Sequence, residues 1–263
     1  KEMPKIIVQT GKTLQIEISD VTIENMGFFG GMSIMAKEEN ITFQNNVWGL
    51  TPDGTEMAFA DLANDANYLA GNHGILSTNK ADNLQVLNNI ITGASTFAIE
   101  VNSATSGVSI IGNRAFTSPF NPVSPPLEND EWFGGAGISA AGLGLTIQDN
   151  VITGLQNIRS TNDTPPEALT VFGAMHTIEN NIIGQDVNGD SVGVCGQGIK
   201  FSTQTDVITP TNNGHLVIDN IIDSSRNGFE NTKGAILWSD TSNPAFRDGG
   251  NTVRGNLVID GPE

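Results

Sequence analysis

The chain has 263 residues, and 38% of them are hydrophobic, which is enough apolar material for a folded core. Its formal net charge is −17, and this disfavours binding to nucleic acid or anionic lipid surfaces, which both require clustered Lys and Arg. Cys195 is the only cysteine, so an internal disulfide is excluded, and no apolar run approaches the roughly 20 residues of a membrane span.

The chain begins at Lys1 and shows no secretory leader. We therefore interpret it as a mature or excised segment, a single domain over residues 1–263 that can belong to a longer chain.

One short pattern recurs eight times from the N-terminus to the C-terminus: an apolar residue, two further residues, an Asn, and then apolar residues again. The copies are "VTIENMGF" (21–28), "ITFQNNVWG" (41–49), "LQVLNNIITG" (84–93), "VSIIGNRAFT" (108–117), "LTIQDNVITG" (145–154), "HTIENNIIG" (176–184), "LVIDNIID" (216–223) and "TVRGNLVID" (252–260). The shared Asn falls at Asn46, Asn89, Asn113, Asn150, Asn181, Asn220 and Asn256. The first copy departs from the pattern, with Met26 in that place and Asn25 just before it.

A second short apolar segment, usually after a Gly, precedes each copy. These segments are 14–18, 32–35, 74–77, 97–101, 137–140, 168–171, 198–201 and 234–238. Their shortness, alternation and Val and Ile content predict strands rather than helices. The alternation predicts inward side chains for Ile99, Ile138, Leu169, Ile199 and Ile236, and outward ones for Glu100, Ser139, Thr170, Lys200 and Leu237.

Eight units of two or three short strands, joined by Asn-marked turns, predict an all-β right-handed parallel β-helix of about eight rungs. In these repeats the chain resembles the secreted right-handed β-helix proteins, a broad class that includes pectate-lyase-like enzymes, phage tailspikes and bacterial surface adhesins. The resemblance implies a secreted or cell-surface location. It does not specify a function.

The recurring Asn has a predicted structural role. Asn tolerates left-handed backbone geometry, so we expect it to occupy that conformation in the turn. Stacked rung on rung, the side-chain amides are expected to form a hydrogen-bonded ladder.

Long insertions are predicted to leave mainly from one corner of the coil and to form a wall of loops on one side, where binding sites of repeat proteins lie. They span 50–73, 118–136, 155–167, 185–197 and 224–233, with a second set at 202–214 and 239–251.

The 118–136 insertion contains an acidic cluster beside aromatic residues. Glu128, Asp130 and Glu131 are the candidate catalytic carboxylates, because glycosidases use paired carboxylates, and Trp132 and Phe133 are candidate sugar-stacking residues. The alternative is a loop that folds back so that Trp132 covers the coil.

The segment "DVNGD" (186–190) resembles the start of a calcium-binding loop, so Asp186, Asn188 and Asp190 are candidate Ca²⁺ ligands. A simple Asn-Gly turn is the alternative, since Gln197 stands where such a loop would need a closing Glu.

Lys200 is a further candidate ligand-binding residue, because a lyase acting on uronates needs a cationic base. Glu100 shares its outward ladder at about 14 Å, three rungs away, which is too far for direct cooperation. His73, His176 and His215 fall in separate rungs, and we expect each to be a strand-end or turn residue.

An outward column rich in Thr on the second strand of each unit invites an ice-binding interpretation: Thr22, Thr42, Gln85, Ser109, Thr146, Thr177, Leu216 and Thr252. The column is single, long loops are expected to break the face, and Thr is also common on any exposed strand.

Two hypotheses follow. The first is a non-catalytic, adhesin-like module, extracellular or on a cell surface, that binds a polysaccharide or a surface protein or acts as a rigid spacer. The second is a carbohydrate-active enzyme, either a glycoside hydrolase or a calcium-assisted polysaccharide lyase. End-to-end self-association is a third idea, because the ends of a β-helix are open sheet edges.

Overall fold

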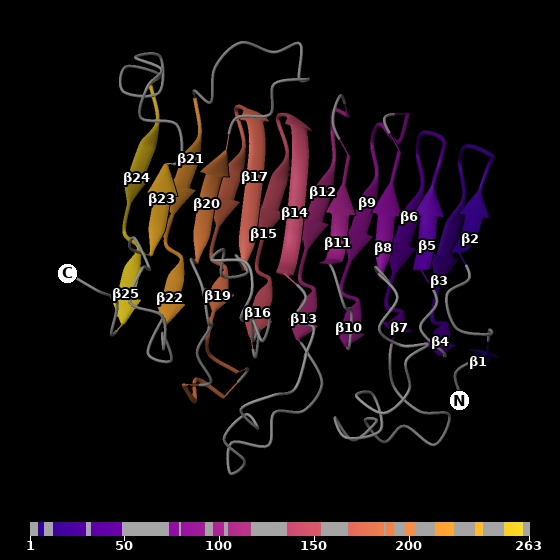
Figure 1. The fold of residues 1–263 in the computed structure, drawn as a ribbon, viewed down its shortest axis with the longest axis horizontal. Coiled ribbons are helices and arrows are strands. Elements are labelled where there is room, and N and C mark those ends of the chain that lie inside the picture. The colour runs from indigo at the N-terminus through magenta and orange to yellow at the C-terminus, as the bar shows by residue number, and fades with distance from the viewer. Residues whose placement is uncertain are drawn as a thin grey trace, which may run out of the picture.

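A computed structural model of the chain shows an all-β parallel β-helix built from three sheets (Figure 1). It describes residues 5–7, 13–29, 33–48, 74–78, 80–92, 97–102, 105–116, 136–153, 168–186, 188–191, 198–202, 214–223, 235–238 and 250–259. Within these residues no helix is long and apolar enough to cross a membrane.

The strands cycle through the three sheets in chain order, and every neighbouring pair within a sheet is parallel. Sheet A contains β1 (Lys5–Ile7), β4 (Gly27–Phe29), β7 (Val47–Trp48), β10 (Ile90–Thr92), β13 (Arg114–Phe116), β16 (Val151–Thr153), β19 (Ile182–Ile183), β22 (Ile221–Asp223) and β25 (Leu257–Ile259). Sheet B contains β2 (Thr13–Ile16), β5 (Ser33–Ala36), β8 (Ile75–Ser77), β11 (Phe97–Val101), β14 (Ala136–Leu143), β17 (Leu169–Ala174), β20 (Ile199–Ser202) and β23 (Ile236–Trp238). Sheet C contains β3 (Thr22–Glu24), β6 (Thr42–Gln44), β9 (Gln85–Leu87), β12 (Ser109–Ile111), β15 (Thr146–Gln148), β18 (Thr177–Glu179), β21 (Leu216–Ile218) and β24 (Thr252–Arg254).

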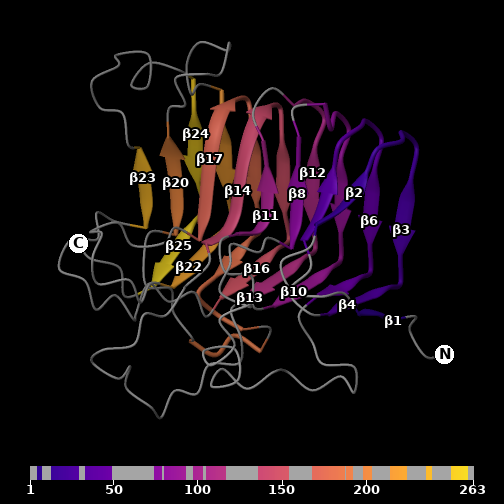
Figure 2. The same cartoon turned by 45° about the vertical axis from the view of Figure 1, so that its right-hand side comes forward.

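The three sheets enclose the interior of the coil (Figure 2), and the core inside it consists of aliphatic residues together with Phe28, Phe43, Trp48 and Phe201. Sheet C contributes the central residue of each strand, such as Ile110 and Ile147, which pair in register and are fully buried. The predicted inward residues Ile99, Ile138, Leu169 and Ile199 are also fully buried, whereas Ile236 is partly buried against the core. The apolar side chains that alternation places on the inner side of these short strands therefore fill the interior.

A glycine stands at or next to the start of several sheet B strands, at Gly74, Gly137 and Gly198, where the backbone lies close to an Ile side chain of sheet A. A Cβ on Gly137 would clash with the side chain of Ile152 and lie 2.5 Å from the carbonyl oxygen of Ala168. Glycine at this position therefore allows sheet B to approach the Ile152 side chain of sheet A closely.

The turn from each sheet C strand to the next sheet A strand, termed the A/C turn, consists of two residues with separate roles. The second is the recurring Asn, and from Asn46 to Asn220 it is buried at 0–1% exposure. In Asn181, the Oδ1 atom accepts the main-chain N–H of Asn150 at 3.1 Å, and the Nδ2 group donates to the carbonyl of Ile147 at 2.9 Å. The same bonds repeat in the other rungs, so the predicted amide ladder is confirmed.

The prediction that this Asn itself takes the left-handed conformation is wrong. Positive φ belongs to the residue before it: Asn25, Asn45, Asn88, Gly112, Asp149, Asn180, Asp219 and Gly255, with φ between 53° and 70°. The first residue of the turn takes the left-handed conformation and reverses the direction of the chain. The side chain of the second residue, the recurring Asn, then points into the coil, where its amide can form hydrogen bonds with neighbouring rungs.

The turn from sheet B to sheet C, termed the B/C turn, repeats the same backbone device. Its left-handed residues are Asp20, Asn40, Asn83, Gly107, Gly144, Met175, Gly214 and Gly250. Met175 is the exception in this series, since its φ is 59° and its side chain is 53% exposed. A left-handed conformation costs an ordinary side chain about 1–2 kcal/mol, and Met175 is therefore a locally strained position.

Replacing Met175 with Asn should stabilise the protein. The substitution supplies the residue type found at Asn40 and Asn83 and should raise the free energy of unfolding by about 1 kcal/mol in chemical denaturation. Met175→Ala is the matched control, because it removes the same exposed side chain and keeps the left-handed strain. Equal stabilities for the two variants would show that backbone strain is not the cause.

Candidate functional site

The acidic and aromatic candidates of the 118–136 insertion lie outside the described residues. These are Glu128, Asp130, Glu131, Trp132 and Phe133. Their roles as catalytic or sugar-stacking residues stay predictions.

The structure brings Asp186, Asn188 and Asp190 together in one tight turn after β19. The Asp186 Oδ1 atom accepts the main-chain N–H groups of Asn188 at 2.8 Å and of Asp190 at 2.9 Å. Its Oδ2 atom accepts the Asn188 side-chain amide at 3.1 Å, and Gly189 takes a φ of 85°. These hydrogen bonds, the one from Asp190 foremost, hold the pKa of the Asp186 carboxyl below its usual value.

This geometry is that of an Asx turn, in which a carboxylate caps its own loop. Both Asp186 oxygens already accept protein donors, and no group of three or more His, Cys, Asp or Glu residues suited to a metal ion occurs in the described part of the chain. The calcium hypothesis for Asp186, Asn188 and Asp190 stays a prediction.

Lys200 lies on the outer side of sheet B, in one ladder with Glu100. The register runs from Glu100 through Ser139 and Thr170 to Lys200, so the two charged residues are three strands apart, as predicted. Both are half-buried, but Ser139 and Thr170 between them are only 8% and 6% exposed. The five residues predicted to point outward therefore share one register, which extends to Leu237, and the two at its centre, Ser139 and Thr170, are covered from solvent.

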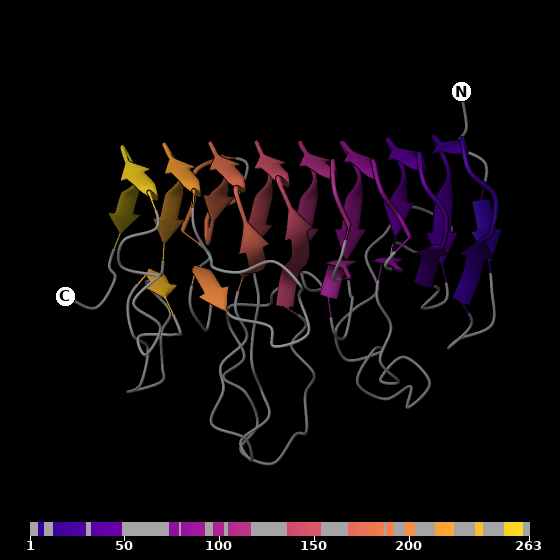
Figure 3. The same cartoon turned by 90° about the horizontal axis from the view of Figure 1, so that it is seen from above.

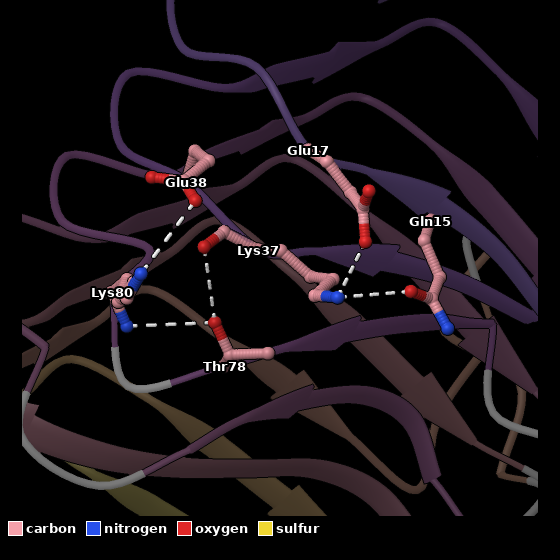
Figure 4. A network of polar contacts seen from close by, with 6 residues as sticks. All are labelled: Gln15, Glu17, Lys37, Glu38, Thr78 and Lys80. Atoms are coloured by element: carbon pink, nitrogen blue, oxygen red, sulfur yellow. Dashed lines mark hydrogen bonds and ion pairs between the residues drawn. The ribbon is translucent and has the colours of Figure 1, made fainter.

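The first rungs carry a polar network where sheet B meets the B/C turn (Figure 4). The Lys37 ammonium donates to Gln15 at 3.0 Å and forms an ion pair with Glu17, which lowers the pKa of the Glu17 carboxyl. The Nζ atom of Lys80, which lies one rung further along the coil, is 3.8 Å from the Oε1 atom of Glu38. Exposed pairs of this kind contribute little to stability.

The outer side of sheet A is mainly aliphatic. From β7 onward its first column consists of Val47, Ile90, Arg114, Val151, Ile182, Ile221 and Leu257, paired in register, and Lys5 and Gly27 precede them. From Val47 onward five of the side chains are half-buried, whereas Arg114 and Leu257 are exposed. The next outward positions include Thr153 at 8% and Asp223 at 0% exposure, so much of this side is covered.

The outer side of sheet C has a different chemistry, and we refer to its two columns together as the sheet C face. The first column is Thr22, Thr42, Gln85, Ser109, Thr146, Thr177, Leu216 and Thr252, and the second is Glu24, Gln44, Leu87, Ile111, Gln148, Glu179, Ile218 and Arg254. All of these are half-exposed or exposed except Ile218, which is 6% exposed. The first column is entirely uncharged, and eight strands at a spacing of about 4.8 Å give the face a length of about 34 Å.

One edge of the sheet C face is uninterrupted. Every A/C turn is two residues long, from Asn25–Met26 to Gly255–Asn256, and the rungs therefore stack evenly along this edge (Figure 3). None of the predicted insertions falls in an A/C turn. The two predicted beside the face, 202–214 and 239–251, belong to the B/C turns and lie outside the described residues except at their ends, so the expectation that loops break the face stays a prediction. The regular pairing makes the sheet C face a periodic surface rather than a pocket.

Two of the predicted turn histidines meet inside the coil. His176 and His215 follow the B/C turns of adjacent rungs, their ring centroids lie 4.9 Å apart, and both are at most 1% exposed. The Nδ1 atom of His176 accepts the N–H of Leu145 at 3.2 Å, that of His215 accepts the N–H of His176 at 3.2 Å, and Asn251 Oδ1 accepts the N–H of His215 at 2.8 Å. The three residues thus form a second polar ladder in the last rungs.

Burial sets the charge state of this pair. Desolvation lowers the pKa of His176 to about 4, and desolvation together with the neighbouring His176 ring lowers that of His215 to about 3. Both rings are therefore neutral near pH 7. The sequence contained a signal for the pair, since each His directly precedes a sheet C strand at the same point of the repeat. His73 lies outside the described residues.

Comparison with known proteins gives no relative: no family model, no curated protein and no solved structure matches this chain.

Proposed function

We propose that this protein is a non-catalytic, adhesin-like β-helix module, secreted or displayed on a cell surface, that binds an extended neutral glycan along the sheet C face. The observation that supports the proposal is the first column of that face, in which hydroxyl or amide side chains occupy seven of eight positions in register, with Leu216 as the exception.

The chemistry of the face favours a chain of sugars over other polymers. Thr, Ser and Gln side chains both donate and accept hydrogen bonds, as sugar hydroxyls do. The net charge of −17 opposes polyanions such as nucleic acid or uronate polymers. A polymer lying along the coil would make a small contact with each rung, and the sum over several rungs would give the affinity.

The proposal predicts an interaction that depends on the sheet C face and not on the net charge of the protein. Native electrophoresis through gels that contain neutral polysaccharides should show retardation of the protein. The double variant Thr146→Arg, Thr177→Arg places two long side chains in the middle of the first column, where both Thr residues are half-exposed. It should lose most of the retardation, on the order of a tenfold weaker apparent affinity, because contact is interrupted on two adjacent rungs.

Met175→Arg is the control, because it adds positive charge beside Thr177 but in the B/C turn rather than on the face. It should keep the retardation of the unmodified chain. Retardation that survives the double variant would overturn the assignment of the sheet C face.

A further inference from the structure

The second column of the sheet C face contains an apolar pair between two carboxamides. The register runs from Gln44 through Leu87 and Ile111 to Gln148 on four successive strands, and all four side chains are half-exposed. At a strand spacing of about 4.8 Å, these residues extend for about 14 Å along the coil. We refer to the four residues together as the amide-flanked patch.

The neighbouring first column is also uncharged along this stretch. Thr42, Gln85, Ser109 and Thr146 stand on the same four strands, so each of the outward side chains of these strands is neutral. The net charge of the chain is −17, and its charged groups therefore lie elsewhere. The contacts that this part of the face can make suit an uncharged ligand.

The strand that carries Ile111 has a glycine in the turn at each end. A Cβ on Gly107 would lie 2.4 Å from the Oδ1 atom of Asn83, and a Cβ on Gly112 would lie 2.3 Å from the Oδ1 atom of Asn88. The side chains of these two asparagines therefore lie against the glycines. Two further carboxamides thus border the strand of Ile111, one at each end, and the turn residues themselves carry no side chain that would cover the strand.

Each half of the amide-flanked patch combines an apolar side chain with a carboxamide. Leu87 lies one strand from Gln44, and Ile111 lies one strand from Gln148. Neither glutamine side chain forms a hydrogen bond with another residue in the described part of the chain. A carboxamide donates through its NH₂ group and accepts through its carbonyl oxygen. The chemical group that matches each half is an acetamido group, since its methyl can pack on the apolar side chain while its N–H and carbonyl bond to the glutamine.

We propose that the amide-flanked patch recognises N-acetylated amino-sugar units, so that the glycan bound along the sheet C face is an uncharged polymer that carries acetamido groups. This inference rests on the function proposed above and specifies the class of sugar. Two acetamido groups, one over each half of the patch, give two methyl contacts and two sets of amide hydrogen bonds. A glucan without acetamido groups keeps hydroxyl hydrogen bonds to Gln44 and Gln148 but loses both methyl contacts.

Titration calorimetry with two uncharged oligosaccharides of the same length and linkage tests the proposal, one built from N-acetylglucosamine and the other from glucose. De-N-acetylated oligosaccharides are unsuitable, because their ammonium groups would bind a protein of net charge −17 through charge alone. The unmodified chain should bind the N-acetylated oligosaccharide on the order of tenfold more tightly, because two methyl groups are removed from water in addition to the hydrogen bonds.

The double variant Leu87→Gln, Ile111→Gln removes both apolar contacts. It introduces the residue type that already stands in the same column at Gln44 and Gln148, so the strands tolerate it. The variant should bind the two oligosaccharides with similar affinity. Leu216→Gln is the matched control, since it makes the same change on the same face three strands beyond Ile111, and it should keep the preference.

The outcomes separate this inference from the function on which it rests. Equal affinity of the unmodified chain for the two oligosaccharides would overturn the inference and leave glycan binding in place. Binding of neither oligosaccharide would overturn both the inference and the proposed function. A preference for the N-acetylated oligosaccharide that survives in the double variant would overturn the assignment of the acetamido contacts to the amide-flanked patch.

Discussion

Lowering the pH from 7 to 5 should destabilise this protein through the two buried histidines, His176 and His215. The two rings are buried and neutral, and their Nδ1 atoms accept main-chain N–H groups, which a protonated imidazole cannot do. In the unfolded chain both groups have pKa values near 6.5, whereas in the folded chain they lie at about 4 and about 3. The unfolded state therefore takes up protons first as the pH falls.

The sign of the effect follows from these values. The stability contributed by the neutral rings is fully present above about pH 6.5 and declines as the pH falls from there toward the folded pKa values. Since one pKa unit corresponds to about 1.4 kcal/mol, the loss for His176 alone approaches about 3 kcal/mol by pH 4. Chemical denaturation at a series of pH values between 7 and 4 measures it.

The double variant His176→Asn, His215→Asn is the matched control. Asn251 already occupies the third position of this ladder and accepts the N–H of His215, so Asn keeps an acceptor and cannot be protonated. The variant should show an almost flat stability between pH 7 and pH 5, with His73 as its only histidine. An unchanged pH dependence in this variant would show that other groups cause the acid sensitivity.

The adjacent residues Asn180 and Asn181 should respond very differently to the same substitution. Asn181→Gly removes a fully buried carboxamide and leaves the Asn150 N–H and the Ile147 carbonyl without their partner. A buried polar group without a partner costs about 1–3 kcal/mol, so the free energy of unfolding should fall by about 4 kcal/mol in total.

Asn180→Gly changes a left-handed, exposed turn residue into the residue type found at Gly112 and Gly255. Its effect on the free energy of unfolding should stay within about 0.5 kcal/mol. Urea denaturation of the two variants compares them directly. A similar decrease in the free energy of unfolding for both variants would mean that the amide ladder does not contribute the stability expected from its burial.

The repeat made the fold predictable from the sequence. The eight copies fix the number of rungs, and the alternation of apolar residues in three-residue strands fixes which side chains face the core. Sequence could not assign the two turn positions correctly, because Asn suits both a left-handed backbone and a buried amide ladder. The first copy of the repeat distinguishes the two turn positions, because Asn25 takes the left-handed conformation while Met26 stands where the other copies have the ladder Asn.

The site was less predictable than the scaffold. The periodic polar column containing Thr146 and Thr177 was visible in the sequence, but its exposure and its uninterrupted A/C edge depend on the uniform length of the turns in three dimensions. Burial of Ser139 and Thr170 was not predictable from alternation, because alternation gives the side of a strand and not what covers it. The contact between His176 and His215 depends on the register of adjacent rungs, which a spacing of 39 residues does not reveal by itself.

The most direct test of a non-catalytic glycan-binding module measures binding and turnover on the same polysaccharides. Neutral and acidic polysaccharides are incubated with the protein and assayed for new reducing ends and for the absorbance of unsaturated uronates. We expect retardation on neutral polysaccharides with no product released above a protein-free control. Product formation that is abolished by Glu128→Gln, Asp130→Asn or Glu131→Gln would contradict the proposal and establish a carbohydrate-active enzyme instead.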